Sequence, residues 1–172
     1  DSEGAEMALN LTVGAFRVLA LLCGMQLIDR CAYIKRTEQG WDVLTRLLGA
    51  DEDPNVRAEA ANALASYGVE RSWPLLQAAF SADGAWLVRC SILSALAEQP
   101  EIKLTWLLEL AQVAITDGDG TVRVSGAEIL GRIVRDGIAQ PIGAEARALL
   151  QPLQQDVDHR VVAAALNGLQ IS

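Results

Sequence analysis

Three kinds of residue are scarce in this chain of 172 residues, which has 3 cysteines, 1 histidine and only 5% aromatic residues. The cysteines, Cys23, Cys31 and Cys90, form no CxxC pair, so they indicate neither a disulfide framework nor a zinc site. The single histidine, His159, excludes a metal site built from several histidines. These absences favour a reducing compartment, and we expect a cytoplasmic protein without a bound metal.

Basic residues and long hydrophobic runs are also few. Lys and Arg total 14 against 22 Asp and Glu, and the net charge of −8 argues against binding to a nucleic-acid backbone. Hydrophobic residues make up 51%, which supplies an aliphatic core and excludes a disordered chain. The most apolar stretch, Leu11 to Met25, is interrupted by Arg17 and is shorter than the roughly 20 residues of a membrane-spanning helix. No membrane span is expected.

Motifs that carry chemistry are missing as well. The sequence contains no GxGxxG, P-loop or GxSxG pattern, so no catalytic residue and no nucleotide cofactor is indicated. The segment from Asp117 to Val122 resembles the middle of a calcium-binding EF-hand loop. In that alignment the first and last ligand positions fall on Ile115 and Gly126, which cannot supply the carboxylates that such a loop needs. The sequence therefore favours a non-catalytic protein.

An internal repeat organises the rest of the chain. Val56-Arg57, Val88-Arg89 and Val122-Arg123 recur at nearly regular intervals, with His159-Arg160 as a looser fourth copy. An Asp precedes the Arg at the same spacing in the first three copies, whereas Gln154 takes that position in the fourth. Each copy reads as an apolar helix, an acidic turn whose Asp residues cap the next helix, and an alanine-rich second helix.

This pattern predicts an all-α fold, because no stretch alternates with the period of a strand. We expect first helices over residues 41–48, 72–80, 102–115 and 144–153, with second helices that begin near Asn55, Ala85, Gly120 and Asp158. The predicted architecture is an α-α superhelix in one continuous domain. An N-terminal helical cap over residues 1–37 precedes four helix pairs at residues 38–69, 70–100, 101–137 and 138–172.

The repeated segments resemble HEAT-type repeats, of the armadillo-like class. The segments concerned are DEDPNVRAEAANALASYG, SADGAWLVRCSILSALAE and TDGDGTVRVSGAEILGRI. They are similar in particular to the short HEAT-like units of the phycobilin lyase (E/F-type) and phycobilisome-associated families. The resemblance implies a ladder of hydrogen bonds between the turn Asp and the helix Arg of successive repeats, on Asp51, Arg57, Asp83, Arg89, Asp117 and Arg123. It leaves the pairing of the fourth unit open.

The second helices line the concave face of this architecture, and residues two and five positions after each Arg should point outward. The predicted concave binding face comprises Glu59, Asn62, Ser91, Ser94, Ser125, Glu128 and, in the fourth unit, Val162 and Ala165, with Leu169 a turn later. This face is polar in the first three units and apolar in the fourth. Either another chain covers the apolar end, or the register assigned to the fourth unit is wrong.

The N-terminal helix departs from the repeat pattern, because it is apolar on almost every side. Such a helix is usually buried on more than one side. We therefore expect a docking helix, with Leu11, Phe16, Leu19 and Leu22 in contact with a protein partner or with a second copy of the chain.

The leading functional hypothesis is a non-catalytic scaffold that binds a protein through its concave face and its N-terminal helices. The resemblance implies an alternative, a phycobilin lyase subunit or a phycobilisome assembly or turnover factor. In that alternative the groove holds a bilin, an open-chain tetrapyrrole. No catalytic residue can be assigned for it.

Overall fold

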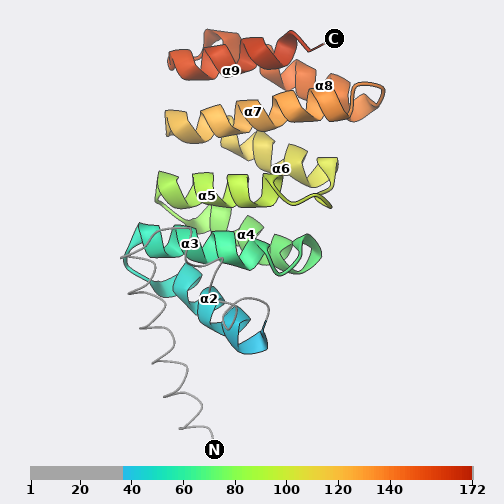
Figure 1. The fold of residues 1–172 in the computed structure, drawn as a ribbon. Coiled ribbons are helices and arrows are strands. Elements are labelled where there is room, and N and C mark those ends of the chain that lie inside the picture. Colours follow the sequence, from blue (N-terminus) through green and yellow to red (C-terminus); the bar gives the residue numbers. More distant parts are fainter. Residues whose placement is uncertain (1–36, 172) are drawn as a thin grey trace, which may run out of the picture. The chain divides into compact units, whose positions relative to one another are not determined.

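A computed structural model describes residues 37–171, which form eight α-helices and one short 3-10 helix and contain no strand (Figure 1). The all-α prediction is confirmed, and the helices follow one another in pairs of the α-α superhelix class. The predicted N-terminal cap, with Leu11, Phe16, Leu19 and Leu22, lies outside the described residues apart from Thr37. The chain divides between Ala95 and Leu96 into two compact units.

Unit 1, which ends at Ala95, contains the first helix pair and most of the second. Its helices are α2 (Glu38–Ala50), α3 (Pro54–Ala65), α4 (Val69–Ala82) and α5 (Trp86–Ala97), whose last residues fall in unit 2. Helix α3 packs against both α2 and α4. Val43 and Leu44 of α2, Val56 of α3 and Leu76 of α4 are completely buried and form the core of this unit.

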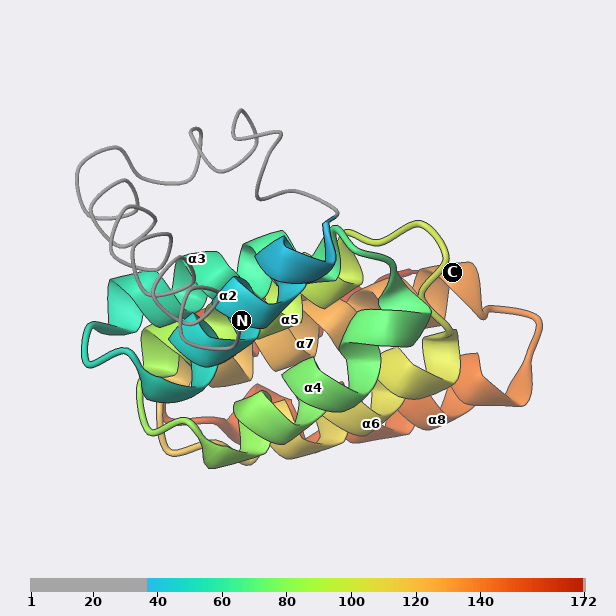
Figure 2. The same ribbon diagram turned by 90° about the horizontal axis from the view of Figure 1, so that it is seen from below.

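Unit 2 begins at Leu96 and contains two complete helix pairs. Its elements are α6 (Leu104–Ala114), α7 (Gly120–Asp136), α8 (Pro141–Leu150), η2 (Pro152–Gln155) and α9 (His159–Leu169). Helix α7 packs against α6, α8 and α9, and α6 also contacts α8. Two layers result, one made of α6 and α8 and the other of α7 and α9 (Figures 1 and 2).

The acidic turns start the second helices by capping them. The side chains of Asp53, Asp119 and Asp158 each accept a hydrogen bond from the backbone N–H two residues later, at 2.8–2.9 Å. Pro54 stands at the first turn of α3, where the N–H that proline lacks would have had no partner within the helix. These local contacts explain why the sequence alone locates the starts of these helices.

The fourth repeat has a different register from the predicted one. In the first repeat the side chain of Asp51 accepts a hydrogen bond from the backbone N–H of Asp53. In the fourth repeat Asp156 accepts the equivalent hydrogen bond from the backbone N–H of Asp158. Val161, not His159, occupies the completely buried position of Val56, and His159 is exposed. The choice of His159-Arg160 as the fourth copy was therefore wrong by two residues, and Asp156 replaces Gln154 as the turn Asp.

Two glycines bring the second helices of unit 2 into close contact. A Cβ atom built on Gly131 of α7 would lie 3.3 Å from the Cα atom of Gly168 of α9. A Cβ atom on Gly168 would lie 3.1 Å from the Cα atom of Gly131 and 2.7 Å from Leu150 Cδ1. The backbones can approach this closely only because neither position carries a side chain.

Candidate functional site

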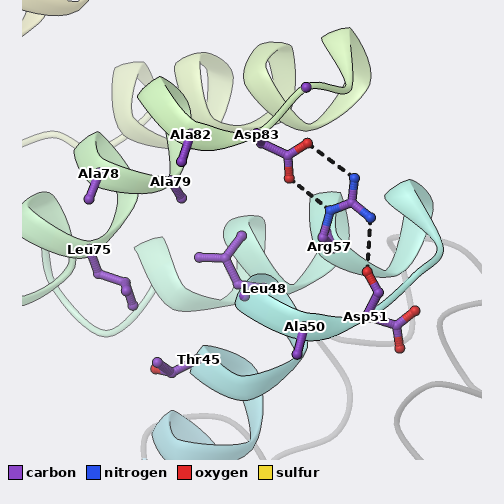
Figure 3. A pocket seen from close by; sticks show the side chains of 12 residues that line it. Thr45, Leu48, Ala50, Asp51, Arg57, Leu75, Ala78, Ala79, Ala82 and Asp83 are labelled. Carbon is purple, nitrogen blue, oxygen red and sulfur yellow. Dashed lines mark hydrogen bonds and ion pairs between the residues drawn. The ribbon is translucent and has the colours of Figure 1, made fainter.

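An ion pair links the two helix pairs of unit 1. Arg57 of α3 donates from Nε to Asp83 Oδ2 at 2.7 Å and from Nη2 to Asp83 Oδ1 at 3.1 Å (Figure 3). Arg57 Nη1 donates to the carbonyl oxygens of Asp51 and Glu52, in the turn that precedes its own helix. Arg57 therefore fixes its own turn and the turn of the next repeat at the same time.

The same arrangement recurs in unit 2. Arg123 donates from Nε and Nη2 to the two carboxylate oxygens of Asp156, at 2.8 and 2.9 Å, and from Nη1 to the carbonyl oxygens of Asp117 and Gly118. The side chain of Asp117 also accepts a hydrogen bond from the backbone N–H of Asp119. Both ion pairs are partly buried, with side-chain exposures of 9–18%. Bidentate pairs of this kind combine charge with fixed geometry.

Arg89, the remaining arginine of the predicted ladder, makes the same contact with its own turn. Its Nη1 donates to the carbonyl oxygen of Asp83 at 2.9 Å. Three of the four repeats thus have an arginine that closes the preceding turn. In the fourth repeat the corrected register puts Val162 at the arginine position, and Val162 is half-buried.

The ion pairs alter the pKa values of the acidic partners. Burial raises the pKa of Asp83, but hydrogen bonds from Arg57 and Ala85 outweigh burial and hold it below its ordinary value. The hydrogen bonds from Arg123 lower the pKa of Asp156 despite its burial. Hydrogen bonds from the side chain and backbone of Arg160 lower the pKa of Asp158 to about 2. These three carboxylates therefore stay ionised over the physiological range.

The outward positions of the second helices define a surface that we call the second-helix face. In unit 1 it comprises Glu59 and Asn62 of α3 with Ser91 and Ser94 of α5. Ser94 is exposed and the other three are half-buried. Glu59 Oε2 is buried without a hydrogen-bond partner. Burial raises the pKa of Glu59, and a hydrogen bond with Asn62 opposes this only in part.

In unit 2 the second-helix face has a different composition from the predicted one. Ser125 and Glu128 of α7 are half-buried and exposed, as outward positions should be. In the corrected register the equivalent residues of α9 are Ala164 and Asn167, whereas Ala165 is completely buried and Leu169 is half-buried. Asn167 therefore occupies the same repeat position in α9 as Asn62 does in α3. The predicted apolar end of this face at Val162 and Leu169 was therefore a consequence of the wrong register.

A groove of about 270 Å³ lies on the second-helix face between α7 and α9. It is lined by Glu128, Gly131, Arg132, Arg135, Ala164, Asn167, Gly168 and Ile171. Four of these residues are charged or carry an amide, and they surround the site where Gly131 and Gly168 bring the two helices together.

Unit 1 has a pocket of about 500 Å³ on the side of the first helices, between α2 and α4 (Figure 3). Alanine and leucine make up half of its lining residues, including Leu48, Leu75 and Ala79. Arg57 and Asp83 lie at one end of the pocket and are already paired with each other. The pocket therefore presents a mainly apolar wall.

Within residues 37–171, no three or more His, Cys, Asp and Glu side chains are arranged to hold a metal ion. In the same part of the chain, no helix has the length and apolar character needed to cross a membrane.

Comparison with known proteins agrees with the helix pairs. Residues 25–97 match the family model of HEAT repeats. No curated protein and no solved structure gives a significant match, and the finer resemblance to phycobilin lyases is not shown by any comparison. The Asp–Arg pair of Arg57 and Asp83 lies within the matched HEAT-like segment.

Sequence reasoning missed Arg132, Arg135 and Asn167, which line the groove of unit 2. The wrong register hid Asn167. A signal for the correct register was present, because Asp156 and Asp158 reproduce the spacing of Asp51 and Asp53. Nothing in the repeat pattern distinguishes Arg132 and Arg135 from other exposed charges on a helix.

Proposed function

We propose that this protein is a non-catalytic scaffold, and that it binds a protein partner through the second-helix face. One observation carries the proposal, namely that the outward positions of the second helices are mostly polar and include exposed side chains in both units. Ser94 in unit 1 and Glu128 and Asn167 in unit 2 are the exposed ones. HEAT repeats commonly serve as protein-interaction scaffolds, which supports the same function.

The Asp–Arg pairs support this function by tying successive helix pairs together within each unit. Arg57 and Arg123 each connect their own turn to the next one, so the helices that carry the face are fixed at their N-terminal ends. A face presented on a rigid support loses less conformational entropy when a partner binds. The N-terminal segment from Leu11 to Leu22 is a second proposed contact, and it rests on the sequence alone.

Paired substitutions test the face. A tagged chain is incubated with native lysate, cross-linked and analysed by mass spectrometry. Ser94→Trp in α5 and Glu128→Trp in α7 should abolish capture of the partner, because a bulky ring obstructs the contact whatever the charge of the partner. Ser81→Trp in α4 and Glu145→Trp in α8 are matched controls, since they make the same changes at exposed positions of first helices.

The controls should capture the same partner as the unmodified chain. Equal capture by all four variants would show that the second-helix face is not the binding surface. Failure of the unmodified chain to retain any partner would remove the scaffold proposal itself.

A further inference from the structure

We infer that the groove between α7 and α9 binds an acidic segment of the partner, and that Arg132 and Arg135 contact a carboxylate of that segment. This inference rests on the proposed scaffold function and assigns a chemical class to what unit 2 binds.

The floor of the groove is formed by residues with little or no side chain. Gly131 and Gly168 are buried against each other at the contact of α7 with α9, and Ala164 also lines the groove from α9. The base of the groove therefore offers no polar side chain. Arg132 and Arg135 line the groove from α7, and Asn167 lines it from α9.

Asp136 positions both arginines without using their terminal nitrogens. The Oδ2 atom of Asp136 accepts a hydrogen bond from Arg132 Nε, and its Oδ1 atom accepts one from Arg135 Nε, each at 3.2 Å. Arg132 Nη1 donates to the carbonyl oxygen of Ala97. Arg132 Nη2 and both Nη atoms of Arg135 have no hydrogen-bond partner among residues 37–171.

These free donors suit a carboxylate. Two guanidinium groups share one carboxylate, Asp136, so one positive charge beside the groove is not neutralised by it. Terminal nitrogens of arginine bind a carboxylate through two parallel hydrogen bonds. The Arg135 side chain is 62% exposed and can reach a partner without rearrangement of the helix.

Two further residues define where the acidic side chain lies. Asn167 has no hydrogen-bond partner among the described residues, and its amide adds a donor from the opposite side of the groove. Glu128 lies about one helical turn before Arg132 and repels acidic groups at that end. The partner's carboxylate is therefore expected beside Arg132 and Arg135 rather than along the whole groove.

The test uses a fluorescently labelled peptide of alternating glutamate and glycine, with binding to the full chain measured by anisotropy. Arg135→Glu should weaken binding by about tenfold or more, because it removes charge-assisted hydrogen bonds and adds repulsion. Arg160→Glu is the matched control, since Arg160 is in the same unit and its side chain is also 62% exposed. This control should bind as the unmodified chain does.

Three results would overturn the inference: no binding of the glutamate peptide, equal binding to both variants, or equal binding of a lysine–glycine peptide. The outcome is separable from that of the scaffold proposal. If Ser94→Trp and Glu128→Trp abolish partner capture while the glutamate peptide does not bind, the scaffold function stands and the acidic specificity is wrong.

Discussion

Arg123 and Asp156 are 33 residues apart in the sequence and form a bidentate ion pair between two successive helix pairs. The pair reproduces the contact of Arg57 with Asp83 in the other unit. It identifies Asp156 as the turn Asp of the fourth repeat, although alignment of the Val-Arg motif points to Gln154.

Substitution of Asp156 tests this register. Asp156→Ala should lower the free energy of unfolding by about 1–3 kcal/mol, because it leaves partly buried donors of Arg123 without an acceptor. Gln154→Ala, at the position that the motif alignment favours, should change the free energy by much less. Urea denaturation followed by circular dichroism measures both, and a larger loss for Gln154→Ala would restore the original register.

Acid should weaken the Asp–Arg pairs. The pKa values of Asp83 and Asp156 are lowered from the ordinary value of 3.8, so the unfolded chain binds protons more readily than the folded one. Above pH 3.8 the two pairs contribute fully to the stability of the fold. This contribution is lost as the pH falls through the lower pKa values that Asp83 and Asp156 have in the folded state. Denaturation of the unmodified chain across this range should show the loss, and Asp83→Asn with Asp156→Asn should make stability less dependent on pH.

Glu59 should show the opposite dependence. Burial raises its pKa above the ordinary value of 4.5, so its contribution to stability is fully present below 4.5 and is lost as pH rises through the folded-state pKa. Glu59→Gln should remove this loss and make the protein relatively more stable near neutral pH. Glu128→Gln makes the same change at an exposed position and serves as the control in thermal unfolding. A gain of equal size in both variants would argue against burial as the cause.

Two glycines at equivalent places in their helices should respond differently to alanine. Gly168 is next to the last residue of α9, and its Cβ would meet Leu150 and the backbone of Gly131. Gly168→Ala should cost about 1–3 kcal/mol by separating α7 from α9. Gly49 is next to the last residue of α2 and has nothing within 4 Å of its Cβ position.

Gly49→Ala should therefore be neutral or stabilising by up to about 1 kcal/mol, as expected from helix propensity. Melting temperatures of the two variants give the comparison. A similar loss for both would mean that the close approach of α7 and α9 does not depend on Gly168.

The helix pairs could be predicted from the sequence because short-range features define them. Asp53 and Asp119 cap residues only two positions away, and Val56 and Val122 follow at fixed spacing on the buried side of the same helix. Such contacts lie within one or two turns, so a linear pattern is enough to locate them.

The tertiary structure decided the features that depend on contacts distant in sequence. Asp156 is recognised as a turn Asp by Arg123 in another helix pair, and Val161 takes the buried position although His159-Arg160 looks like the motif. Gly131 and Gly168 become a helix contact, and Arg132, Arg135 and Asn167 line one groove, only when α7 lies against α9. The helical period gives the side of a helix on which a residue lies, whereas packing between helices decides what that residue meets.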